Sequence, residues 1–149
     1  MTLKLTSLPD TELADALAAC GLTGGAARLV LEQGPFSDDA ELCMAVDSVT
    51  TTLSADDLRQ ALEAIPEPAV ERGDPDAHQA ALLAIRLYRE RFGYPFVSGV
   101  DTPTAEELLM RVRIRLGNDP EPEGRAAREH LRRLIRRGIQ KLQERDLEV

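Results

Sequence analysis

The amino-acid sequence predicts an all-α fold, a single-domain helical bundle crossed by one short extended strap. Apolar side chains recur three and four residues apart in nearly every segment, and capping residues or glycines bound these segments. The exception is the run YPFVSGV at 94–100, which is aromatic and β-branched without a charge, but one strand alone forms no sheet. The chain has 149 residues and no internal repeat, so we expect residues 1–149 to form one domain.

Four helices are predicted in the first half of the chain. Pro9 and Asp10 mark the start of the first helix, and Ser54 caps the fourth. The run Thr50-Thr51-Thr52 is expected to fray the end of the third helix, because it is entirely polar and β-branched. The four predicted segments are about 9–20, the stretch between Gly25 and Gly34, the stretch from Ser37 to Val49, and the stretch from Ser54 to Ile65.

Three longer helices are predicted in the second half. Asp74-Pro75 begins one that runs to Phe92 and stops at Gly93. Thr104 begins the next, which closes at Gly117. The last helix spans about 121–146. Gly138 inside this helix costs on the order of 1 kcal/mol relative to alanine, which indicates close packing or a lost side chain at that position.

Charge and cysteine content exclude several classes of function. The net charge is −8, and residues 1–103 hold 17 of the 26 acidic but only 7 of the 18 basic side chains, which argues against nucleic acid as a partner. The arginines at 132, 133, 136 and 137 are interpreted as a solvated helix face. No apolar stretch reaches the length of a membrane span, and Cys20 and Cys43 suit reduced thiols packed as small hydrophobes, so we expect a cytoplasmic protein without a membrane partner.

The titratable groups leave few candidates for chemistry. With only two histidines, a metal site is not expected. His130, in the middle of the last helix, is predicted to lie at the surface. His78 falls in the first turn of a helix that follows the proline-rich loop 66–75, where a general acid or base could stand, although an exposed histidine without a role fits equally well. The acidic residues of this region either pair for acid–base work or stabilise the helix N-terminus.

The order of motifs resembles the 2-oxo-4-hydroxy-4-carboxy-5-ureidoimidazoline (OHCU) decarboxylases of urate breakdown. YRERFGYPFV matches the family's Y-x-x-K/R-F-G-F/Y-x-F segment, and RLGNDPEPE matches its R-hydrophobic-x-N-x-x-x-x-E segment at the same separation. The opening LTSLPDTELADAL, the Gly34-Pro35-Phe36 turn, the stretch LRQALEAIPEP and the closing LIRRGIQKL are similar to the corresponding family segments. The resemblance implies the family's all-α fold over nearly the whole chain, and a homodimer.

The resemblance also implies three catalytic side chains that this sequence replaces. Ile65 stands where the family has the histidine of its His-Pro motif, and His78 stands in the region of the family's glutamate. The family's arginine on the last helix falls at about Gly138, with Arg136 and Arg137 displaced by roughly 200° and 100° around the helix. Losing a general acid or base costs about 10²–10⁴-fold in rate.

We therefore predict a diverged relative that binds or acts on a small oxygenated or carboxylated molecule other than the urate-pathway intermediate. It would use no cofactor and no metal, and if it catalyses a reaction it would be a lyase or isomerase. The alternatives are a working OHCU decarboxylase that forms (S)-allantoin, and a non-catalytic protein that binds a ligand or partner. The predicted site consists of His78 as general acid or base and of the substrate-binding residues Pro66, Gln79, Phe92, Phe96, Ser98 and Gly99.

Overall fold

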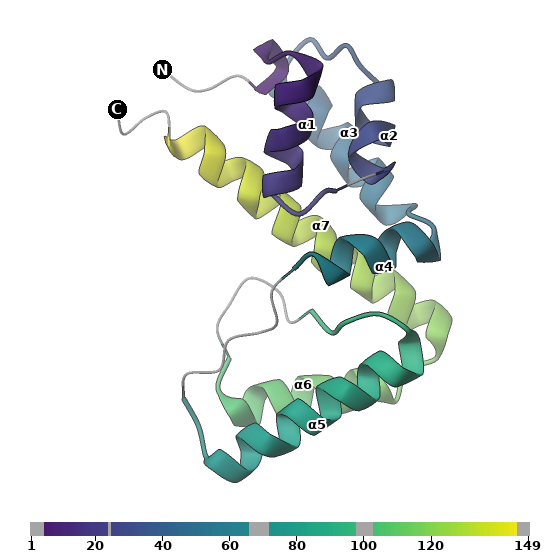
Figure 1. Ribbon diagram of the computed structural model, residues 1–149, viewed down its shortest axis with the longest axis vertical. Helices are drawn as coiled ribbons and strands as arrows, with labels where there is room; N and C mark the ends of the chain where they lie inside the picture. Colours follow the sequence, from purple (N-terminus) through teal and green to yellow (C-terminus); the bar gives the residue numbers. More distant parts are fainter. Residues whose placement is uncertain (1–4, 24, 66–71, 98–102, 146–149) are drawn as a thin grey trace.

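The protein is an assembly of helices, as the sequence predicts. The structure is a computed structural model, and it describes residues 5–23, 25–65, 72–97 and 103–145. Within these residues it has helices only and no strand (Figure 1). The elements are the 3-10 helix η1 Leu5–Ser7 and the α-helices α1 Asp10–Ala19, α2 Gly25–Glu32, α3 Asp39–Thr51, α4 Ala55–Glu63, α5 Pro75–Phe92, α6 Ala105–Leu116 and α7 Pro120–Arg145.

Capping side chains begin three of these helices where the sequence places them. Asp38, Ser54 and Thr104 each accept a hydrogen bond from the backbone N–H three residues later, which satisfies one of the unpaired amides of α3, α4 and α6. Pro75 occupies the start of α5, and Gly93 ends it in the left-handed conformation at φ 83°. Helix existence and start positions therefore follow from local sequence.

The predicted fraying of α3 is wrong. The helix continues through Thr51, because the hydroxyl of Thr50 donates to the carbonyl of Val46 at 2.6 Å and that of Thr51 donates to the carbonyl of Asp47 at 2.9 Å. Thr50 is fully buried, so its hydroxyl cannot reach water and bonds instead to a backbone carbonyl of its own helix.

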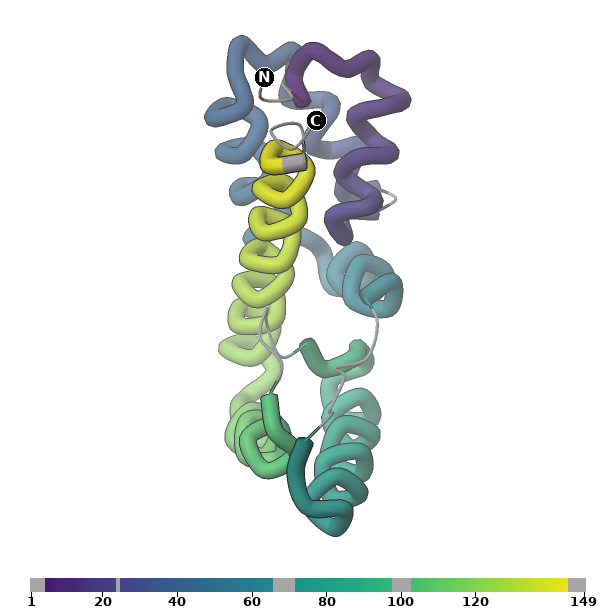
Figure 2. The backbone as a smooth tube through the Cα atoms, turned by 90° about the vertical axis from the view of Figure 1, so that its left-hand side faces the viewer, coloured from purple at the N-terminus to yellow at the C-terminus, as the bar shows by residue number. Residues whose placement is uncertain are grey.

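Helix α7 forms the long axis of the molecule. Helices α1, α2 and α3 gather around its C-terminal half, α4 crosses near its middle, and α5 and α6 lie at its N-terminal end (Figures 1 and 2). No helix in the described part of the chain is long and apolar enough to cross a membrane.

Helices α5 and α6 run parallel to each other. At their N-terminal ends the N–H of Ala105 donates to the carbonyl of Arg72, and the N–H of Asp74 donates to the carboxylate of Glu106 at 2.8 Å. At the other end Arg91 donates to the carbonyl of Asn118. The segment 93–104 therefore connects opposite ends of the pair, and we call its described residues 93–97 the returning segment. Its residues Pro95–Val97 have no regular secondary structure, and the rest of the predicted strap, residues 98–100, lies outside the described residues.

Gly138 allows α1 to end directly against α7. A Cβ placed on Gly138 would stand 2.9 Å from the Cβ of Cys20, a distance that real Cβ atoms do not reach. The close packing predicted at this glycine is therefore confirmed. Cys20 and Cys43 are both free thiols that are half-buried against the core, as expected for small apolar side chains.

Candidate functional site

A buried polar cluster joins α5, α6 and α7 beside the returning segment. Glu123 is completely buried, and it accepts hydrogen bonds from the hydroxyl of Tyr88, from Arg115 at 2.7 Å and from the side-chain amide of Asn118 at 2.9 Å. Burial, with the hydrogen bond to Glu123, raises the pKa of Tyr88, so the phenol remains a donor. The charge of Glu123 is thus compensated by one guanidinium and two neutral donors.

Arg115 extends this cluster to the backbone of the returning segment. Its Nη1 donates to the carbonyl of Val97 at 2.7 Å, and its guanidinium lies over the ring of Phe96 at 4.5 Å from the centroid. The cluster fixes the chain at Val97, immediately before residues 98–102, which lie outside the described residues. The motif formed by Arg115, Asn118 and Glu123 in the sequence therefore builds a buried hydrogen-bond network.

A cavity of about 520 Å³ lies where the ends of α1 and α4 meet the middle of α7. Its volume is in the range of small-molecule sites. Helix α4 contributes the residues just after its C-terminus, and α7 contributes one face of two helical turns. The lining residues are Ala18, Ala19, Cys20, Gly21, Ala64, Ile65, Leu134, Arg137, Gly138 and Lys141.

The cavity has a cationic side and an apolar side. Arg137 and Lys141 are four residues apart on α7 and so share a face of the helix. Neither makes an ion pair or hydrogen bond with any residue that the structure describes. Ile65 and Leu134 supply apolar surface, and burial raises the pKa of the Cys20 thiol to about 11, so this thiol is protonated at neutral pH. The arrangement can bind an anion that carries an apolar or neutral body.

No lining residue of this cavity is suited to proton transfer at neutral pH. Among the described residues that line it there is no carboxylate and no imidazole. Proton transfer near pH 7 needs a group whose pKa lies near that value, and burial moves the pKa of the Cys20 thiol away from it. Likewise, no group of three or more His, Cys, Asp and Glu side chains in the described ranges could hold a metal ion.

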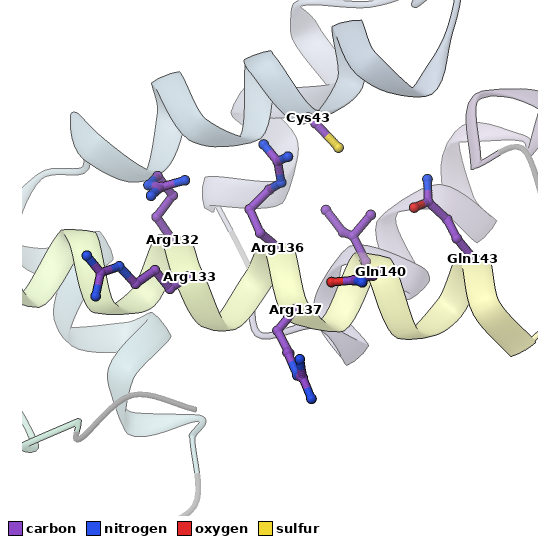
Figure 3. A pocket seen from close by; sticks show the side chains of 8 residues that line it. Cys43, Arg132, Arg133, Arg136, Arg137, Gln140 and Gln143 are labelled. Atoms are coloured by element: carbon purple, nitrogen blue, oxygen red, sulfur yellow. The ribbon is translucent and has the colours of Figure 1, made fainter. Parts of the chain in front are cut away.

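The direction of Arg137 distinguishes it from its neighbours. Arg132 and Arg136 rise from α7 towards α3, whereas Arg137 points away on the other side of the helix (Figure 3). Arg136 is held by Asp47 of α3 at 2.8 Å. The run of four arginines in the sequence is therefore divided between two sides of α7, as its helical spacing predicts.

The described members of the sequence-predicted site lie at separate places in the structure. His78 is half-buried in the first turn of α5, and Gln79 beside it is exposed. Phe92, at the other end of α5, is 14 residues or about 21 Å from His78 along the helix. Pro66, Ser98 and Gly99 lie outside the described residues. Their roles, and that of His78, remain predictions.

The two predicted aromatic contacts lie in different surroundings. Phe96 is 3% exposed and packs edge-on against Tyr88, so it belongs to the core around the Glu123 cluster. Phe92 lines a separate cavity of about 540 Å³ beside Tyr94 and Arg128, at the start of α4 and α7. Neither residue is among those lining the cavity with Arg137 and Lys141.

His130 is not the surface residue that the sequence suggested. It is half-buried, and its Nδ1 is buried without a hydrogen-bond partner among the described residues. Burial, with a smaller effect of Arg115, lowers the pKa of His130. The position lies on α7, beside the arginine-rich turn, where the helix passes from the α5–α6 pair to α3.

Comparison with protein-family models and comparison with known proteins point to the same family. Residues 67–137 match the family model for OHCU decarboxylase. The chain resembles the OHCU decarboxylases. The 2-oxo-4-hydroxy-4-carboxy-5-ureidoimidazoline decarboxylase of Amia calva is 40% identical over 53 residues, which are 36% of this chain and 30% of that protein.

A solved structure shows the same fold. The crystal structure of (S)-allantoin synthase superposes with a TM-score of 0.74 at 21% identity, over 93% of this chain and 52% of that chain. The present chain thus spans about half of the (S)-allantoin synthase chain, and a smaller share of the Amia calva protein is matched. The all-α fold expected from the resemblance to OHCU decarboxylases is confirmed.

The cavity beside Gly138 is lined by two positions that the resemblance singles out. The two positions at which an OHCU decarboxylase would carry its histidine and its arginine are Ile65 and about Gly138, and both line this one cavity. Sequence reasoning missed Lys141 and the accompanying wall from α1. Lys141 could have been predicted from the spacing of two cations, Arg137 and Lys141, on either side of Gly138 in one helix. The residues of α1 could not, because their position depends on tertiary packing.

Proposed function

We propose that the chain is a diverged member of the OHCU decarboxylase family whose cavity between α1, α4 and α7 binds a small carboxylated molecule. The observation that carries this proposal is the pair Arg137 and Lys141 on the rim of a cavity that holds no acidic side chain among its described lining residues. A ligand carboxylate would compensate charges that the described protein leaves without a partner.

The ligand is expected to combine a carboxylate with a compact body. Arg137 presents a planar fork that suits a carboxylate in a bidentate geometry, and Lys141 adds a point charge one helical turn away. Ile65 and Leu134, which also line the cavity, favour an apolar or neutral group. A ureido acid of few atoms has both features.

We expect this cavity to bind its ligand without transferring a proton to or from it. Ile65 can neither donate nor accept a proton, and Gly138 leaves no room for a longer side chain against Cys20. Loss of a general acid or base typically lowers a rate by about 10²–10⁴-fold. We therefore expect negligible acceleration of OHCU decarboxylation, and no use of a cofactor.

Titration calorimetry with ureidoacetate and with its uncharged amide tests this proposal. The wild-type protein should bind the acid and not the amide, and Arg137→Gln or Lys141→Gln should each weaken binding about tenfold, as expected for one charge-assisted hydrogen bond. Arg125→Gln is the matched control, because Arg125 is also an exposed cation of α7 but lies far along the helix. Equal binding of acid and amide, or equal loss in the control, would contradict the proposal.

A working decarboxylase is the second candidate. It is favoured by the intact cluster of Arg115, Asn118 and Glu123, which fixes the chain at Val97 just before the segment that the resemblance assigns to substrate binding. In that case His78 would have to serve as the acid or base. Full activity of His78→Ala would eliminate this residue from the reaction.

We also propose that the protein is a homodimer of single-domain subunits. The outer faces of α5 and α6 expose Leu83, Leu87, Met110 and Ile114 at 54%, 46%, 64% and 65%. A second copy of the chain would remove these side chains from water. Sedimentation should show a dimer for the wild type and for Met44→Glu, which changes an exposed methionine of α3, and a monomer for Ile114→Glu. A wild-type monomer would overturn this assignment.

A further inference from the structure

A second cavity lies on the other side of α7, where this helix packs beside α3 (Figure 3). Its volume is about 440 Å³, and Cys43 and Ile139 supply its apolar surface. The remaining lining residues are all donors of hydrogen bonds, and none is acidic. They are Arg132, Arg133, Arg136, Arg137, Gln140 and Gln143.

Polar contacts hold the two helices on either side of this cavity. The side-chain amide of Gln143 donates to Asp39 at 2.9 Å, and Arg136 donates to Asp47 at 2.8 Å, two helical turns further along α3. Cys43 lies between the two acceptors in the sequence of α3 and faces the cavity. The walls are therefore fixed by contacts between α3 and α7.

The charges around the cavity do not balance. Asp47 is paired with Arg132 and Arg136, and Glu129 is paired with Arg132 and Arg133. Two carboxylates thus form ion pairs with three guanidinium groups, and Arg137 adds a fourth guanidinium group at the edge of the cavity. With Asp39, which Gln143 holds at the same wall, the described groups leave an excess of about one positive charge at this place, in a chain whose net charge is −8.

Two of the guanidiniums retain donors for a ligand. Arg136 has one named acceptor, Asp47, and Arg133 has one, Glu129 at 3.3 Å, although each guanidinium carries five N–H groups. Gln140 lies one turn beyond Arg136 on the same face of α7 and adds an amide. These donors face a common space from one helix.

We propose that this cavity binds the phosphate group of a small phosphomonoester, or inorganic phosphate. A phosphomonoester is an anion at neutral pH and offers three acceptor oxygens, which suit the positive excess and the donors of Arg133, Arg136 and Gln140. The volume leaves space for the alcohol part of the ester beside Cys43 and Ile139. This site shares Arg137 at its edge with the carboxylate site proposed above, whereas Arg133, Arg136 and Gln140 line this cavity and not that one.

Titration calorimetry with inorganic phosphate and with glycerol phosphate, at constant ionic strength set by chloride, tests the proposal. Arg133→Gln should weaken binding about tenfold. Arg125→Gln is a closely matched control, because each of these arginines belongs to α7 and pairs with the glutamate four residues before it. The side chains are 61% and 67% exposed, so neither variant is expected to unfold the protein.

Three outcomes would overturn the proposal. The first is the absence of saturable phosphate binding by the wild-type protein. The second is an equal loss of binding in Arg125→Gln and Arg133→Gln, which would indicate a general charge effect. The third is a loss of phosphate binding in Lys141→Gln as large as in Arg133→Gln, because Lys141 lines only the other of these two cavities. Since Lys141→Gln tests the carboxylate site and Arg133→Gln the phosphate site, failure of one is distinguishable from failure of the other.

Discussion

Gly138 of α7 and Cys20 at the end of α1 are in direct contact, and a Cβ on Gly138 would stand 3.0 Å from both the Cα and the Sγ of Cys20. An arginine at position 138, where OHCU decarboxylases carry one by the resemblance, would therefore displace α1. The cationic side of the cavity is instead formed by the neighbours Arg137 and Lys141. This contact connects the packing of α1 against α7 with the lining of the cavity.

Replacing Gly138 by alanine should destabilise the protein. Overpacking against Cys20 costs about 1–3 kcal/mol, and the better helix propensity of alanine returns at most about 1 kcal/mol. A net loss of about 1 kcal/mol in the free energy of unfolding is expected in urea denaturation. Gly117→Ala is the control, because a Cβ there would stand 3.5 Å from the carbonyl of Ile114, an ordinary contact, and this variant should be nearly neutral.

Removal of the buried carboxylate of Glu123 should have a much larger effect. Glu123→Ala leaves Arg115 without its carboxylate partner and should cost about 3–5 kcal/mol of stability. Tyr88→Phe removes the hydrogen bond that the phenol donates to Glu123 and the one that it accepts from Arg115 at 3.2 Å, and it should cost about 1.5–3 kcal/mol. Glu121→Ala, two residues away on the surface of α7 and 87% exposed, should change stability by less than about 0.5 kcal/mol. Equal effects of Glu123→Ala and Glu121→Ala in denaturation experiments would refute the role of the cluster.

His130 should make the stability depend on pH in mildly acidic solution. Burial lowers its pKa below the ordinary value of 6.5, so below pH 6.5 the unfolded chain binds a proton that the folded chain does not bind. The free energy of unfolding should therefore fall as the pH decreases from 6.5 towards 4.5, the ordinary pKa of glutamate, below which carboxylates also contribute. His130→Leu should flatten this part of the stability curve. A curve of unchanged slope in that variant would contradict the assignment.

The helices could be predicted because their signals are local. Caps such as Ser54 and Thr104 and the stop at Gly93 act within one helical turn, and each has the expected effect in the structure. The extension of α3 through Thr51 was not predicted, because hydroxyl groups can also bond to the backbone of their own helix.

The candidate site could be predicted only in part. The resemblance pointed to Ile65 and Gly138 as altered positions, and the structure places both on one cavity. The wall formed by Cys20 and the half-buried state of His130 follow from which helices pack against α7, and spacing along one helix does not contain that information. The burial of Glu123 is a further tertiary effect, since its sequence neighbours Glu121 and Pro122 are exposed.

The rate of CO₂ release from freshly prepared OHCU, measured with stoichiometric protein, decides whether this protein catalyses the decarboxylation. Because the described lining of the cavity supplies cations but no group for proton transfer, we predict release at the spontaneous rate and racemic allantoin as the product. Acceleration over the spontaneous reaction, with one allantoin enantiomer in excess and loss of the effect in Arg137→Gln, would contradict the account and establish a working decarboxylase.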